Sequence, residues 1–118
     1  MNKEKEIYKE PKYKRLYRAV GCEEFYSIMK TNRFSFHPKG VDVKYFGLDF
    51  KETLDFADEL MNIDLVAVVE VIVLEEILNK IGDFIDVDPF LFKTGTIEIQ
   101  SEHLDEFNSA IYSIIHRF

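Results

Sequence analysis

Residues 65–73 constrain the fold more than any other stretch of this 118-residue chain. Seven of these nine residues are leucine or β-branched, and Glu70 is the only charge among them. A helix needs about 20 apolar residues to cross a bilayer, so the stretch is too short to span a membrane. β-Branched residues favour strands, and the stretch therefore predicts a buried central strand. A chain of this length has room for one core, so we expect a single compact domain.

Segments with strand and helix periodicity alternate along the rest of the chain. Residues 13–20 alternate as a strand with Leu16, Arg18 and Val20 on one face and Tyr17 and Ala19 on the other. Further strands are expected at 43–48, 84–87 and 96–100, and helices at 22–31, 50–61, 74–81 and 101–118. Helices inserted between strands without strict alternation indicate an α+β domain of about five strands and three to four helices.

Residues suited to helix ends support these boundaries. Asp49 precedes a predicted helix and Glu52 follows three residues later, which is the spacing of a capping box. Asn32 can adopt the left-handed conformation that ends the first helix, and Gly82 ends the third.

The segment 101–118 permits two structures. Ser101 can cap a helix, and the apolar residues after it recur at helical spacing as far as Phe118. We therefore expect a helix there. The alternative is that residues 110–115 pair with the sheet as an edge strand.

Charge is distributed unevenly. Residues 1–18 hold seven lysines and arginines against three glutamates, a net +4, whereas residues 19–118 hold eight basic and nineteen acidic residues, a net −11. The acidic body would repel phosphates, so we expect no nucleic-acid partner. Residues 1–11 are expected to form a flexible charged tail and 12–118 the domain.

The sequence shows neither a signal segment nor a membrane span, which favours a cytoplasmic location without a membrane partner. The oligomeric state is left open.

Residue types that bind metals are few and scattered. Cys22 is the one cysteine, and histidines 37, 103 and 116 lack metal-binding spacing, so we expect no metal site. His37 and Lys39 lie in a turn-forming loop that could line a cleft and contact an anion. The alternative is an ordinary solvated loop.

Arg18 is the most informative single residue because it lies inside a strand. Desolvating a guanidinium costs several kcal/mol unless the group meets an anion. That anion could be a phosphate or pyrophosphate of a ligand, or one of the acidic side chains of the domain.

Three short motifs follow one another in a recognisable order. They are Leu16-Tyr17-Arg18; Lys44-Tyr45-Phe46, which runs into a helix that buries Ala57; and the strand 65–73. Over roughly residues 14–108 the chain resembles bacterial ADP-ribosyltransferase-type domains. The resemblance implies small split β-sheets with inserted helices that clamp NAD across a cleft, and signature residues on three strands.

The resemblance also implies roles for individual residues. Arg18 matches a residue that contacts the NAD phosphates or ribose, and Tyr45 matches an aromatic that stacks on nicotinamide. Glu98 matches the catalytic glutamate, although here Gln100 follows it, whereas the family often has Glu or Gln two residues before it. Glu98 and Gln100 are thus the candidate catalytic residues, and His37 joins Arg18 and Tyr45 as a candidate NAD contact. The alternatives are an ordinary rim aromatic at Tyr45 and a solvent-facing strand residue at Glu98.

Two functions follow from this reading. The first is NAD binding, with transfer of ADP-ribose to a macromolecular acceptor if the site is active. The second is a non-catalytic binding module of the immunity or inhibitor type, whose acidic helices dock a basic protein. The acidic residues in question are Asp55, Asp58 and Glu59 on one helix and Glu102, Asp105 and Glu106 on another.

Overall fold

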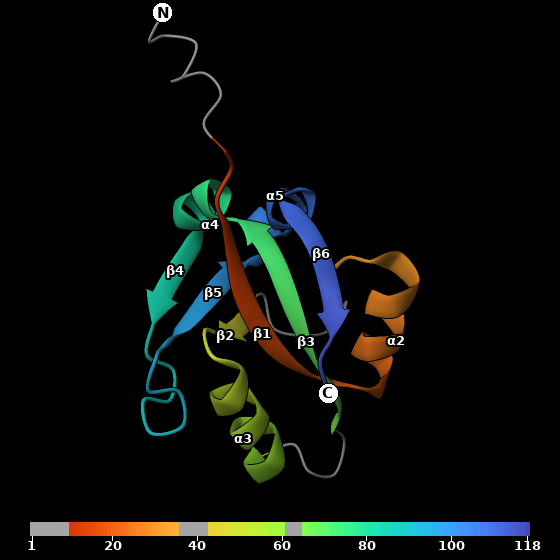
Figure 1. The fold of residues 1–118 in the computed structure, drawn as a ribbon, viewed down its shortest axis with the longest axis vertical. Coiled ribbons are helices and arrows are strands. Elements are labelled where there is room, and N and C mark those ends of the chain that lie inside the picture. The colour runs from red at the N-terminus through yellow and green to blue at the C-terminus, as the bar shows by residue number, and fades with distance from the viewer. Residues whose placement is uncertain (1–9, 36–42, 61–64) are drawn as a thin grey trace, which may run out of the picture.

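A computed structural model describes residues 10–35, 43–60 and 65–118. The predicted α+β domain is confirmed, with four α-helices and six strands within these ranges (Figure 1). In chain order the elements are β1 (Tyr13–Gly21), α2 (Cys22–Thr31), β2 (Val43–Gly47), α3 (Phe50–Leu60), β3 (Leu65–Leu74), α4 (Glu75–Ile81), β4 (Gly82–Ile85), β5 (Thr96–Gln100), a 3-10 turn (Ser101–His103), α5 (Leu104–Ser109) and β6 (Ile111–His116). None of these helices is both long enough and apolar enough to span a membrane.

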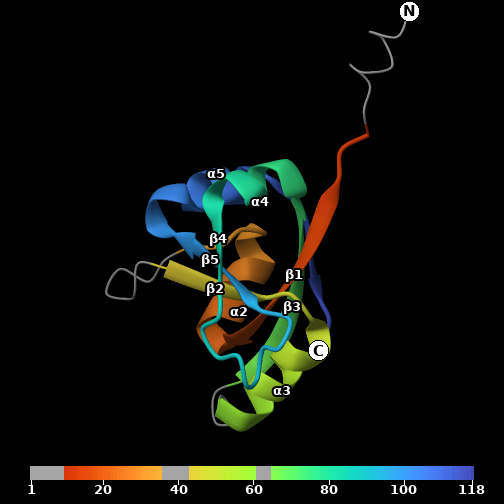
Figure 2. The same ribbon diagram turned by 90° about the vertical axis from the view of Figure 1, so that its left-hand side faces the viewer.

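The six strands form one antiparallel sheet in the order β4-β5-β2-β1-β3-β6. The sheet is nearly divided in two, because β1 and β2 pair only at Tyr17 and Gly47. By contrast, β1 pairs with β3 along its whole length, and β2 pairs with β5 along its own. Figure 2 shows β2 running across the direction of β1 and β3. The domain therefore consists of two three-stranded half-sheets, β4-β5-β2 and β1-β3-β6, that meet at one point.

Each face of the β1-β3-β6 half-sheet has its own apolar cluster. On one face, buried side chains of β1 and β3 pack with a trio of aromatic rings, Phe34, Phe46 and Phe107. On the other face, Ala19 and Val68 pack against Ala57 of α3. The predicted alternation in β1 is confirmed, because Leu16 and Val20 belong to the first cluster and Tyr17 and Ala19 to the second.

The helix ends predicted at Asn32, Asp49 and Gly82 are confirmed, whereas Ser101 does not cap a helix, because it is the first residue of the 3-10 turn and α5 begins at Leu104. Asn32 ends α2 in the left-handed conformation, with φ 56°, and donates its N–H to the Ile28 carbonyl. Asp49 caps α3, since its Oδ2 accepts the Glu52 N–H at 3.0 Å. The Glu52 carboxylate does not complete the capping box, however, because it accepts both the N–H and the hydroxyl of Thr94. Glu52 thereby fastens the segment before β5 to α3.

The predicted helix over 101–118 is wrong beyond residue 109. α5 ends at Ser109, and residues 111–116 form β6, which pairs antiparallel with β3. The edge-strand alternative for 110–115 is the one observed. Without β6, the strongly apolar β3 would present an unpaired edge, and the ladder of hydrogen bonds to β3 outweighs the helical spacing of the isoleucines.

The N-terminal boundary is described only in part. Most of the predicted tail, residues 1–9, lies outside the described residues. Lys12 is already tied to the domain, because its carbonyl accepts the Glu75 N–H at 2.9 Å.

Candidate functional site

A cavity of about 440 Å³ lies at the joint between the two half-sheets. Tyr17 and Arg18 point to opposite faces of β1, yet both line it. The cavity therefore extends around the joint, where β1 and β2 separate. Its walls are Tyr17, Arg18 and Ala19 of β1, Glu24 of α2, Tyr45, Phe46 and Gly47 of β2, Thr53 and Phe56 of α3, Thr96 of β5, and Val87, Asp88 and Phe92 of the segment before β5.

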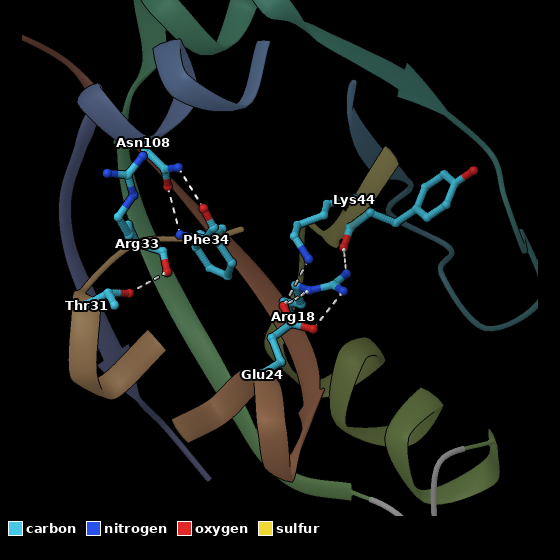
Figure 3. A network of polar contacts seen from close by, with 8 residues as sticks. Arg18, Glu24, Thr31, Arg33, Phe34, Lys44 and Asn108 are labelled. Carbon is cyan, nitrogen blue, oxygen red and sulfur yellow. Dashed lines mark hydrogen bonds and ion pairs between the residues drawn. The ribbon is translucent and has the colours of Figure 1, made fainter. Parts of the chain in front are cut away.

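The Arg18 guanidinium has a partner within the domain. Its Nε and Nη2 donate to the two carboxylate oxygens of Glu24 at 2.6 and 3.0 Å, and its Nη1 donates to the Tyr45 carbonyl at 2.9 Å (Figure 3). This is the bidentate geometry that makes arginine–carboxylate pairs strong. An acidic side chain thus supplies the anion that the position of Arg18 requires, and the guanidinium links β1, α2 and β2.

Lys44 completes a cluster of three charges beside the cavity. It is only 7% exposed, and its Nζ lies 3.5 Å from Glu24 Oε2 (Figure 3). Burial alone would raise the pKa of Glu24, but the hydrogen bond from Arg18 and the positive charges of Arg18 and Lys44 bring that pKa below its ordinary value. Burial lowers the pKa of Lys44, and the charge of Arg18 acts in the same direction. With both cations protonated, the cluster carries one net positive charge.

The candidate catalytic residues lie beside the cavity rather than in its walls. Glu98 of β5 is directly opposite Tyr45 of β2 in the antiparallel register. Residues opposite each other in such a pair have Cβ atoms about 5 Å apart on one face. Gln100 shares this face and donates its amide to the Glu98 carboxylate. Neither Glu98 nor Gln100 is among the described residues that form the cavity walls.

Two of the five predicted site residues thus share one cavity. Tyr45, which is 38% exposed, and Arg18 are 27 positions apart in sequence and both line it. Glu98 is the cross-strand neighbour of Tyr45, and Gln100 is held by Glu98. His37 lies outside the described residues.

Sequence reasoning missed the part played by Glu24 and Lys44. Glu24 had the appearance of an ordinary first-turn acid of a helix, and Lys44 that of a flanking charge in a strand motif. One signal was available: α2 starts directly after β1, so an acid in its first turn stays close to the strand that carries Arg18.

The described residues contain no group of three or more His, Cys, Asp or Glu that could hold a metal ion.

The two acidic helices, α3 and α5, lie at opposite ends of the domain (Figures 1 and 2). Several of their carboxylates already pair with basic neighbours: Asp55 with Lys51, Asp105 with Arg33, and Glu106 with Lys80. The two helices therefore present separate acidic faces rather than a single one.

Comparisons of the chain with protein-family models, with curated proteins and with solved structures found no match.

Proposed function

We propose that this domain is ADP-ribosyltransferase-like and binds NAD in the cavity between its half-sheets. The observation that carries the proposal is the position of Arg18 and Tyr45, which come from different half-sheets and line the same cavity. Its volume of about 440 Å³ falls in the range of small-molecule sites, about 300–1,000 Å³.

Arg18 supplies the anion contact. Its Nη1 and Nη2 each use one hydrogen in the contacts described above, and each carries a second N–H. These remaining donors can bind oxygens of the NAD pyrophosphate while Glu24 keeps the guanidinium in place. The net positive charge shared by Arg18, Glu24 and Lys44 favours an anion there.

Aromatic side chains supply the remaining contacts. Tyr45 lines the cavity with Tyr17, Phe56 and Phe92, so the cavity offers rings from both half-sheets and from α3. Such rings favour flat ligand groups, which nicotinamide and adenine both are. Tyr45 would pack against nicotinamide.

Glu98 would act in the transfer of ADP-ribose. The bond between the nicotinamide nitrogen and the ribose C1′ breaks, and its electron pair leaves with nicotinamide. A nucleophile of the acceptor attacks C1′ and loses its proton. A carboxylate beside C1′ stabilises the positive charge that develops on the ribose. The hydrogen bond that the Gln100 amide donates to the Glu98 carboxylate would orient that carboxylate for this role.

Thermal denaturation with and without NAD tests the binding proposal. A ligand that binds only the folded state raises the melting temperature by mass action, so millimolar NAD should stabilise the protein. Tyr45→Ala should abolish the NAD-dependent rise while leaving the melting temperature without NAD nearly unchanged, because Tyr45 is partly exposed.

The matched control is Tyr112→Ala. Tyr112 is 69% exposed on β6 and lies outside the cavity walls, so this variant should keep the full NAD-dependent rise. A parent protein whose melting curve is the same with and without millimolar NAD would contradict the proposed function.

A further inference from the structure

A buried carboxylate lies behind the tyrosine that forms one wall of the cavity. Gly47, Tyr17, Glu70 and Ile115 are in register across β2, β1, β3 and β6. Glu70 and Tyr17 are therefore direct cross-strand neighbours on one face. Glu70 is only 3% exposed, and burying a carboxylate is costly unless it is paired.

Glu70 is paired with Arg117. The Arg117 Nη1 donates to Glu70 Oε1 at 2.6 Å, and the Arg117 guanidinium lies 4.8 Å from the centre of the Phe50 ring. The Tyr17 ring packs against the same Phe50, with ring centres 5.9 Å apart. Burial, the hydrogen bond to Glu70 and the negative charge of Glu70 all raise the pKa of Tyr17. Tyr17, Glu70, Arg117 and Phe50 thus form one packed group behind the cavity wall.

The backbone of Arg117 is also held in place, by hydrogen bonds to β3. Arg117 N–H donates to the Val68 carbonyl at 3.0 Å, and Val68 N–H donates to the Phe118 carbonyl at 2.9 Å. Residues 117–118 thereby extend the pairing with β3 beyond β6. A connected series of contacts leads from this segment through Arg117 and Glu70 to the cavity wall at Tyr17.

We propose that Glu70 and Arg117 are positioning residues that hold the Tyr17 ring as a fixed wall, against which a flat ring of the bound dinucleotide packs. Stability alone is a weak reason for the arrangement, because buried ion pairs can often be replaced by apolar residues without loss. A ring held in one orientation before binding does have a benefit, since binding then loses less side-chain entropy. The inference rests on the proposed function and adds a second aromatic contact to it.

The test measures dissociation constants by calorimetry for NAD, ADP-ribose and nicotinamide mononucleotide. ADP-ribose carries only the adenine ring and nicotinamide mononucleotide only the nicotinamide ring, so the two probes identify the ring that meets Tyr17. Tyr17→Leu keeps an apolar side chain and removes the ring. Loss of one stacking contact should weaken the binding of NAD about tenfold. It should weaken the binding of one partial probe, nicotinamide mononucleotide or ADP-ribose, by the same factor and leave the affinity for the other probe unchanged.

Arg117→Gln should reproduce the same selective loss more weakly, about threefold, and Arg117→Lys should restore most of it because lysine can pair with Glu70. The controls are Tyr112→Leu, outside the cavity walls, and Arg33→Gln, which breaks only an exposed ion pair with Asp105. Both controls should bind all three probes as the parent does.

The outcomes separate this inference from the function on which it rests. A parent that binds none of the three probes overturns both. A parent that binds NAD, with Tyr17→Leu and Arg117→Gln at parental affinity, overturns the positioning inference alone. An equal loss for all three probes in Arg117→Gln, without rescue by Arg117→Lys, also overturns it, because a general structural defect has that effect.

Discussion

Arg18, Glu24 and Lys44 show how a strand can hold a partly buried charge when partners lie within the domain. The Glu24 carboxylate accepts two hydrogen bonds from Arg18 and lies within ion-pair distance of Lys44. Because each charge has a partner, the desolvation of all three is compensated. Removing Glu24 would leave two cations side by side, so this carboxylate is the residue on which the cluster depends.

The lowered pKa of Glu24 gives a testable dependence of stability on pH. In the folded protein this pKa lies below its ordinary value of 4.5. Glu24 therefore contributes stability above about pH 4.5, and the contribution is lost as the pH falls through the lower folded-state pKa, where the unfolded chain binds more protons. Urea denaturation between pH 7 and pH 3 should show a steeper loss of the free energy of unfolding for the parent than for Glu24→Gln.

Glu23→Gln is the matched control, since Glu23 is an exposed residue of the same helical turn. Its pH dependence should follow that of the parent. If Glu24→Gln also follows the parent, Glu24 is not the partner that stabilises Arg18.

At the residue scale, the sequence was sufficient to predict that Arg18 needs an anion, but not which anion it has. The cost of burying a guanidinium can be read from its position in a strand. The partner depends on how α2 turns back toward β1 after Gly21, and that is a matter of tertiary packing. Glu70 is a similar case, because its partner Arg117 is 47 residues away.

At the element scale, β3 is the centre of its half-sheet, between β1 and β6. Val69 and Val71 are fully buried there. Truncating either to alanine removes buried methyl groups and leaves a small cavity, so each variant should lose about 1–3 kcal/mol of unfolding free energy in urea titrations. Val87→Ala, at an exposed position, should cost less than about 0.5 kcal/mol. Equal, small losses for all three variants would show that β3 is not central.

Periodicity predicted most elements with nearly correct bounds, and it failed where one pattern suits two structures. α2 and β5 have the predicted bounds because the periodicity of each is clear. Asn32 marks the end of α2, and Gly95 and Ser101 flank β5. In β6, isoleucines at positions 111, 114 and 115 fit both a helix and a strand. The available edge of β3 decides between them, and no local sequence window contains that edge.

At the scale of the whole molecule, the cavity exists because the sheet is nearly divided. β1 and β2 share one pair of residues and then separate, and the opening between them is lined by both strands and by α3. The resemblance led to the expectation of a cleft shared by Arg18, Tyr45 and Glu98. Arg18 and Tyr45 line the cavity, and Glu98 is not among its described walls. The segment before β5, with Val87, Asp88 and Phe92, could not be predicted as a wall because its path depends on its attachment to α3 through Glu52.

The same architecture sets Glu98 next to the cavity without making it a wall, so the proposed binding of NAD and the proposed chemistry can be tested separately. A carboxylate that acts on the charge of the transition state contributes little to the affinity for NAD and much to the rate. Glu98→Gln should therefore keep the NAD-dependent rise in melting temperature and lose the release of nicotinamide, measured with a cell lysate as the source of acceptor. Glu76→Gln is the matched control, because Glu76 is an exposed residue of α4 outside the cavity walls and should leave the release unchanged. If the parent binds NAD and releases no nicotinamide, the altered order of Glu98 and Gln100 marks a site that binds the dinucleotide without cleaving it.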